Sequence, residues 1–175
     1  MAFVLPEEII KNLFLNEGMH VADFGAGTGA FSIAAGKLIG SGHVYAIEVV
    51  SDLLPKIKSD AAARGVFNVE VIRGDIETVG GTTLSAKSVD RVIISNVLFQ
   101  AEDKEGVAKE AARVLKPNGL ALVVDWSASY GGLGPADKDV FPKDKAVALF
   151  LNNGFALANE ISAGDFHYGF VVRRL

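Results

Sequence analysis

Cysteine is absent from this chain of 175 residues, and its absence removes several kinds of chemistry at once. Without thiols there are no disulfides, no cysteine nucleophiles, no iron–sulfur clusters and no cysteine-ligated zinc. The three histidines, His20, His43 and His167, are far apart in the sequence and are expected at surface or strand-edge positions. Three such isolated imidazoles do not make a metal site, so we expect no metal.

Long apolar runs and clusters of one charge are missing as well. No segment reaches the ~18–20 apolar residues of a transmembrane helix, and Glu7 and Glu8 lie where a signal peptide would be apolar. We therefore expect a cytoplasmic protein with no membrane association. The net charge is −4 and the basic residues are scattered, apart from Arg173 and Arg174, which predicts no nucleic-acid partner.

The chain does contain enough apolar sequence for one well-packed domain. Hydrophobic residues make up 50% of it and charged residues 22%. A domain of this size buries roughly 70% of the surface that its unfolded chain exposes. We expect a single domain over residues 1–175, with no room for a second catalytic domain, and surplus apolar surface would suit a homodimer.

The most informative segment is VADFGAGTG, residues 21–29. Its first half has the apolar character of a buried strand, and Gly25, Gly27 and Gly29 allow a tight turn and a close approach of the backbone to a ligand. A helix is predicted directly afterwards, over residues 30–39. A strand, a glycine loop and a helix N-terminus in succession predict a nucleotide-cofactor site, because free N–H groups and the helix dipole point at the ligand.

The remainder of the chain alternates between strand and helix patterns. This alternation predicts a parallel, doubly wound α/β sheet with right-handed crossovers, closed by an antiparallel hairpin. The predicted strands are 43–50, 69–77, 90–100, 120–126, 155–162 and 166–174, and the predicted helices are 51–65, 102–116 and 142–153.

Two further segments are expected to lie over a ligand site. Residues 1–17, with Pro6 at a helix start, predict a packed N-terminal helical cover. The stretch 127–141 is longer than the ~12–15 residues of most structureless connections, so it is expected to be either functional, as a substrate loop, or mobile.

Polar residues come at the ends of several predicted strands. They are Asp23, Glu48, Asp75, Ser95 and Asn96. In open α/β sheets ligands bind beyond the carboxyl ends of the strands, near the point where the strand order reverses. The sequence therefore predicts that these side chains share one rim with the glycine loop.

With these motifs, the whole chain resembles the class I S-adenosylmethionine-dependent methyltransferases. The matching motifs are the glycine loop 21–29, Glu48, GDIE (74–77), SNVLFQ (95–100) and RVLKPNGLALVVDW (113–126). The pattern is similar to small methyltransferases of the ubiquinone/menaquinone-biosynthesis-like and arsenite-methyltransferase-like branches, and the lack of thiols disfavours arsenite. The resemblance implies a Rossmann-like sheet of seven strands, mostly parallel with an antiparallel C-terminal hairpin strand, in three α/β/α layers.

The resemblance also implies which residues contact the methionine part of S-adenosylmethionine. Asp23 would steady the glycine loop and the amino end of the cofactor. Gly25, Ala26 and Gly27 would pass under the methionine portion, and Gly29 would complete the motif.

On the adenosine side, the resemblance implies that Glu48 binds both ribose hydroxyls through its two carboxylate oxygens. Val49 would pack on the adenine, Asp75 would accept a hydrogen bond from the adenine amino group, and Ile76 would cover the other face of the ring. Asn96 would border the methyl group.

The implied reaction is transfer of a methyl group to a small-molecule acceptor, with S-adenosylhomocysteine as product. A sulfonium methyl is already activated, so the protein mainly aligns the acceptor, and no obligatory acid or base is implied. The catalytic residues and the acceptor are therefore left open. SNVLFQ (95–100) lacks the Asn or Asp, Pro-Pro and aromatic signature of base and glutamine methylation, which argues against those substrates.

Two alternatives stay open. Residues 25–30, GAGTGA, also fit the dinucleotide-binding pattern, and Glu48 would serve an NAD ribose equally well, so an NAD-dependent oxidoreductase is one alternative. Such an enzyme would need a substrate domain. The other alternative is a non-catalytic or partner-dependent module that binds S-adenosylmethionine.

Overall fold

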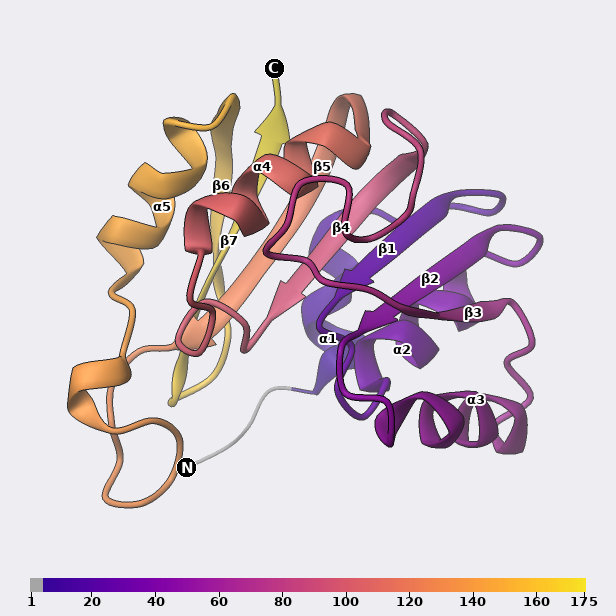
Figure 1. The fold of residues 1–175 in the computed structure, drawn as a ribbon, viewed down its shortest axis with the longest axis horizontal. Helices are drawn as coiled ribbons and strands as arrows, with labels where there is room; N and C mark the ends of the chain where they lie inside the picture. Colours follow the sequence, from indigo (N-terminus) through magenta and orange to yellow (C-terminus); the bar gives the residue numbers. More distant parts are fainter. Residues whose placement is uncertain (1–4) are drawn as a thin grey trace.

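A computed structural model describes residues 5–175, so the part of the predicted N-terminal cover at residues 1–4 lies outside the described residues. The described chain forms one seven-stranded sheet in the order β3-β2-β1-β4-β5-β7-β6 (Figure 1). The strands are β1 His20–Phe24, β2 His43–Glu48, β3 Val69–Arg73, β4 Val89–Ser95, β5 Leu115–Trp126, β6 Phe155–Ser162 and β7 His167–Arg174.

The first five strands are parallel, and the predicted antiparallel hairpin closes the sheet. β7 runs antiparallel to β5, and β6 runs antiparallel to β7. The fold predicted from the sequence is confirmed. One consequence matters for the site: β7 begins at the edge where β5 ends, so His167 lies opposite Trp126.

Helices cover both faces of the sheet, because strand side chains alternate between two apolar layers. Val21 packs in one buried cluster with residues of α1, its 3₁₀ continuation η1 and α2, whereas its neighbour Ala22 packs in the other with residues of α4 and α5. Figure 1 shows the resulting three layers. The helical segments are α1 Pro6–Ile9, η1 Ile10–Leu13, α2 Ala30–Leu38, α3 Leu53–Ala63, α4 Lys104–Val114, η2 Asp137–Asp139 and α5 Lys143–Leu151.

None of these helices, all within residues 5–175, is long and apolar enough to cross a bilayer.

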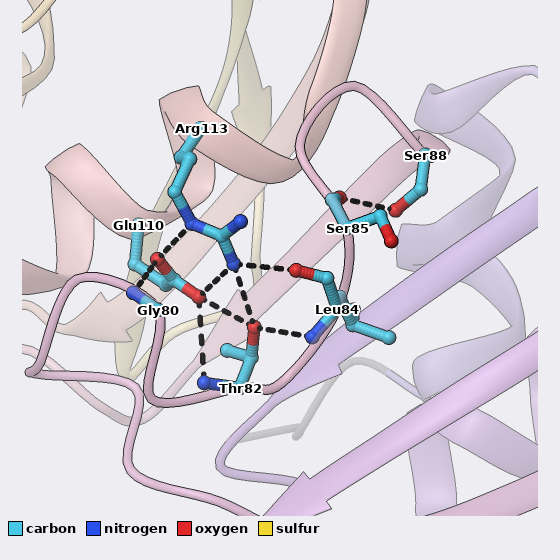
Figure 2. A network of polar contacts seen from close by, with 7 residues as sticks. All are labelled: Gly80, Thr82, Leu84, Ser85, Ser88, Glu110 and Arg113. Atoms are coloured by element: carbon cyan, nitrogen blue, oxygen red, sulfur yellow. Dashed lines mark hydrogen bonds and ion pairs between the residues drawn. The ribbon is translucent and has the colours of Figure 1, made fainter.

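The long connection between β3 and β4 is fixed to α4 by a polar network (Figure 2). The carboxylate of Glu110 is fully buried, pairs with Arg113 at 2.7 Å and accepts a 2.7 Å hydrogen bond from the amide of Gly80. Thr82 donates its hydroxyl to the same carboxylate, and Arg113 donates to the carbonyl of Leu84. This network fixes residues 80–84 of the connection against α4.

Candidate active site

A cavity of about 610 Å³ opens at the carboxyl edge of the sheet, where the predicted rim lies. Its walls come from the ends of β1 to β5, the beginning of β7, and α1. Nine of the ten site residues predicted from the sequence line it: Asp23, Gly25, Ala26, Gly27, Glu48, Val49, Asp75, Ile76 and Asn96.

The glycine loop leaves open space beside its middle glycine. Gly25 and Gly27 have φ values of 69° and 54°, in the left-handed region that side chains rarely adopt. A Cβ built on Gly25 would lie 3.0 Å from Cγ2 of Val97, so that position is tightly packed. On Gly27 the nearest atom in the described chain would be the carbonyl oxygen of Gly25 at 3.9 Å, so Gly27 faces open space.

Gly29, the tenth predicted residue, is not among the described residues that line the cavity. It has a φ of 79°, and a Cβ there would lie 2.9 Å from Cγ2 of Ile57 on α3. Its amide donates to the carbonyl of Ala26, and its own carbonyl accepts from Ile33 at the start of α2. The expectation that Gly29 contacts the ligand is therefore not supported, because this glycine lets α2 start and pack against α3.

Glu48 ends β2 and fixes the glycine loop from the opposite side. Its Oε2 accepts a 2.9 Å hydrogen bond from the amide of Gly27, and its Oε1 accepts from the amides of Val49 and Val50, also at 2.9 Å. The side chain is only 6% exposed. A carboxylate has about four acceptor positions, so three protein contacts still leave capacity for a ligand hydroxyl. The sequence did not indicate these loop contacts.

Asp23 is a buried carboxyl group that faces the cavity. Burial raises its pKa to about 6, while hydrogen bonds from Ser32 act in the opposite direction and the nearby charge of Glu48 adds to the rise. The hydroxyl of Ser32 donates to Oδ2 at 2.6 Å. Ionisation of Asp23 is therefore less favourable than in water, and a cationic group placed in the cavity would stabilise the ionised form.

The end of β3 contributes one polar and one apolar wall. The carboxylate of Asp75 accepts hydrogen bonds from the amide of Glu77 at 2.9 Å and the hydroxyl of Thr78 at 2.8 Å, which fixes this turn. Ile76 lines the cavity, as does Val49, which is 60% exposed. An exposed valine beside a cavity suits a flat apolar group as its cover.

Asn96 follows β4 with a φ of 56°, a conformation that asparagine tolerates better than most residues. Its amide donates to the carbonyl of Val124, and its carbonyl accepts from the side chain of Gln100. Its side-chain Oδ1 is buried and finds no hydrogen-bond partner within residues 5–175. Buried acceptors are nearly always satisfied, so this atom is a specific candidate for ligand contact.

Asp125 supports this part of the rim, and the sequence did not single it out. Its carboxylate accepts hydrogen bonds from the amides of Leu98, Phe99 and Trp126, and it is 1% exposed. Burial raises the pKa of Asp125 to about 6, although these amide hydrogen bonds lower it. The residue ties the turn after Asn96 to the end of β5.

His167 was expected at a surface or strand-edge position without a function, and the structure places it at the beginning of β7, on the rim of the cavity. It lines the cavity, is half-buried, and its ring centroid lies 4.3 Å from that of Trp126. Burial lowers the pKa of His167, which favours the neutral imidazole. The signal that would have found it is strand direction, because an antiparallel β7 brings its first residue to the carboxyl edge.

The two predicted covering segments differ in their relation to the cavity. Pro6 and Ile9 of α1 line it. Residues 127–141, all described, contribute none of its lining. Tyr130 in that loop instead packs edge-on against Phe166, with ring centroids 4.9 Å apart.

Comparisons with known proteins agree with this geometry. A family model described as a methyltransferase domain matches residues 15–152. A demethylmenaquinone methyltransferase of Geobacillus kaustophilus is 28% identical over 122 residues, which cover 69% of this chain and 51% of that protein. An arsenite methyltransferase of Halobacterium salinarum is 30% identical over 109 residues, covering 62% of this chain and 27% of that protein.

Thus the chain spans about half of the first relative's length and about a quarter of the second's. Among solved structures, a SAM-dependent methyltransferase from Aquifex aeolicus superposes with a TM-score of 0.87 at 24% identity, over 97% of this chain and 89% of that one. That likeness shows the fold.

Proposed function

We propose, from the premise that this chain belongs to the methyltransferase domain family, that it binds S-adenosylmethionine in the cavity and transfers the methyl group to a small-molecule acceptor. S-adenosylmethionine is the cofactor of this class I family. The observation that carries the proposal is one cavity lined by the glycine loop and by the residues that end β2, β3 and β4. The comparisons lend no support to the oxidoreductase alternative.

The residues present fit this cofactor. The space beside Gly27 admits a ligand that a side chain would block. Asp23, whose charge is poorly compensated, suits the ammonium group at the amino-acid end. Val49 and Ile76 offer apolar surface for a purine ring, and Asp75 offers a carboxylate beside it.

Each residue would then have a distinct task. Asp23 would bind the amino end, and the remaining acceptor capacity of Glu48 would serve the ribose hydroxyls. Asp75 and Ile76 would hold the adenine edge and face. Because Glu48 already binds the amide of Gly27, one side chain would couple the shape of the loop to ribose binding.

The bound cofactor would supply an activated methyl group, which is displaced in line by the acceptor. The chain's own contribution would be alignment and exclusion of water. Asn96, fixed through the carbonyl of Val124 and supported by Asp125, would border the reacting centre. The cofactor would leave as S-adenosylhomocysteine.

The acceptor is an uncharacterised small molecule. The named relatives include a demethylmenaquinone methyltransferase and an arsenite methyltransferase. This chain has no cysteine, so it offers no thiolate to a soft metalloid. An organic acceptor is the better match.

A thermal-shift comparison tests the cofactor assignment. S-adenosylmethionine, S-adenosylhomocysteine and NAD would be added separately, and a ligand at 100 times its dissociation constant adds ~2.7 kcal/mol of apparent stability. We expect stabilisation by the first two. Stabilisation by NAD alone would contradict the proposal.

Transfer of labelled methyl into a size-fractionated cell extract tests catalysis. We expect label in the small-molecule fraction. Bound cofactor with no labelled product would instead favour the non-catalytic or partner-dependent binding module.

A further inference from the structure

The cavity extends beyond the part assigned to the cofactor. The sheet order places β1, β2 and β3 on one side of it and β4, β5 and β7 on the other. We call this second part the acceptor half. Its lining includes Ile9, Asn96, Gln100, Val124, Ala163 and His167.

Two polar side chains, which come from different strands, line this half. Asn96 directly follows β4, and His167 begins β7, with β5 between them. Neighbouring strands are ~4.8 Å apart, so the two backbones are separated by roughly 10 Å. Val124 of β5, which pairs with Ser95 of β4 and Gly169 of β7, also lines the cavity. The separation of the two backbones suits one small ring between β4 and β7.

The charges on the cavity wall are distributed unevenly. The four carboxylates that line it, Asp23, Glu48, Asp75 and Glu77, all come from β1 to β3 and their loops. No lysine or arginine of residues 5–175 lines it. An anionic acceptor would therefore find no positively charged side chain along this lining, and its desolvation would be costly.

One lysine that contacts a lining residue is already engaged. Lys104 donates its ammonium to the carbonyl of the lining residue Ala101 at 2.6 Å and lies over the ring of Phe141. His167 does not supply a positive charge at neutral pH, because burial lowers its pKa. A cationic amine would also find no carboxylate in the acceptor half.

From this arrangement we infer that the acceptor is an uncharged molecule with a hydroxyl group, oriented between the side-chain Oδ1 of Asn96 and the imidazole of His167. The inference rests on the proposed methyl transfer and names the class of its acceptor. The buried Oδ1 needs a hydrogen-bond donor, and a hydroxyl group can supply one. The apolar side chains of Ile9, Val124 and Ala163 suit a hydrocarbon or aromatic body.

Three probes of similar size separate the charge classes: catechol, benzoate and benzylamine. Each would be titrated into the protein with and without saturating S-adenosylhomocysteine, and side-chain NMR signals of Asn96 and His167 would be followed. We expect catechol to bind at least tenfold more tightly than the other two and to shift both signals. Equal or tighter binding of benzoate or benzylamine, or catechol shifts at neither residue, would overturn the inference.

Two variants and a matched control locate the binding. Asn96→Gly removes Oδ1 and suits the positive φ, and His167→Leu removes the imidazole while remaining apolar. Each should weaken catechol binding at least fivefold, whereas His43→Leu, at an exposed histidine on the opposite edge of the sheet, should not. Unchanged catechol affinity in both site variants would contradict the inference.

The proposed cofactor and the proposed class of acceptor are tested by different measurements, so either can fail alone. Calorimetry with S-adenosylhomocysteine alone decides whether the cofactor binds. The ranking of the three probes, which is also measured without the cofactor product, decides the acceptor class.

Discussion

Two buried glutamates in this protein hold loops in similar ways but differ in what surrounds them. Glu48 is 6% exposed and Glu110 is fully buried, and both accept hydrogen bonds from backbone amides of a glycine-containing loop. Glu110 also pairs with Arg113 at 2.7 Å. Glu48 has no ion pair within the described chain, and it lines the cavity.

The difference distinguishes a structural carboxylate from one available to a ligand. Although burial opposes it, hydrogen bonds from Arg113, Gly80 and Thr82 keep the pKa of Glu110 below its ordinary value. The residues that contact Glu110 also contact one another, as Arg113 and Thr82 do (Figure 2). Glu48 and Asp23 line a cavity to which no lysine or arginine of residues 5–175 contributes. Their negative potential can therefore stabilise a positively charged cofactor.

The largest expected effect is on folding. Glu110→Ala should lower the free energy of unfolding by about 3–5 kcal/mol, because it leaves Arg113 without its carboxylate and the loop amides without an acceptor. Urea denaturation measures this, with Glu105→Ala, in an exposed pair with Lys109, as the control. Cofactor affinity per folded molecule should stay unchanged. If Glu110→Ala lowered the free energy of unfolding by less than about 1 kcal/mol, Glu110 would not be the structural carboxylate that the comparison with Glu48 requires.

The next effect is on binding. Glu48→Ala should weaken S-adenosylmethionine binding by roughly 1.5–3 kcal/mol, the scale of a hydrogen bond to a charged group. Calorimetry measures the affinity, and circular dichroism checks folding. Glu48→Gln keeps the size and one acceptor oxygen, so its loss should be smaller. Unchanged affinity in a folded Glu48→Ala protein would refute the ribose assignment.

Two glycines of the same loop give a matched pair. Alanine at either Gly27 or Gly29 costs about 1–2 kcal/mol of stability because of the positive φ. Gly29→Ala should cost more, since its Cβ would displace Ile57, while Gly27→Ala should lose more cofactor affinity. Thermal unfolding and calorimetry on both variants test this. The reverse ranking of affinities would place the ligand at Gly29.

The smallest effect depends on pH. The pKa of Asp23 is raised to about 6 from an ordinary value of 3.8, so its contribution to stability is present below about 4 and is lost as the pH rises through 6. A bound ammonium group favours the ionised form, so cofactor affinity should fall as the pH drops below 6. Calorimetry at pH 7.5 and 5 measures this.

Asp125 titrates in the same range, so Asp23→Asn is the required control for this pH dependence. Its cofactor affinity should be lower and should vary less between the two pH values. An equal pH dependence in both proteins would assign the effect to Asp125.

The sequence predicted the architecture well because it depends on local patterns. Alternating strand and helix periodicities, and Asp165 with its neighbours in a short turn, are enough to specify a parallel sheet and a closing hairpin. The strand-end positions of Asp23, Glu48, Asp75 and Asn96 followed from the same pattern, and all four line the cavity.

The missed features depend on contacts between distant segments. Neither the packing of Gly29 against Ile57 nor the support of Asn96 by Asp125 has a local signature. His167 is different, since the predicted antiparallel hairpin already implied that the beginning of β7 reaches the rim. Applying strand direction to the last strand would have recovered it.

The most direct measurement is NMR on the protein bound to S-adenosylmethionine carrying a ¹³C-labelled methyl group. The proposed site predicts nuclear Overhauser contacts from that methyl to the side chains of Asn96 and Val124, which line the acceptor half. Saturating binding with methyl contacts to neither residue would contradict the proposed orientation and the acceptor half that depends on it.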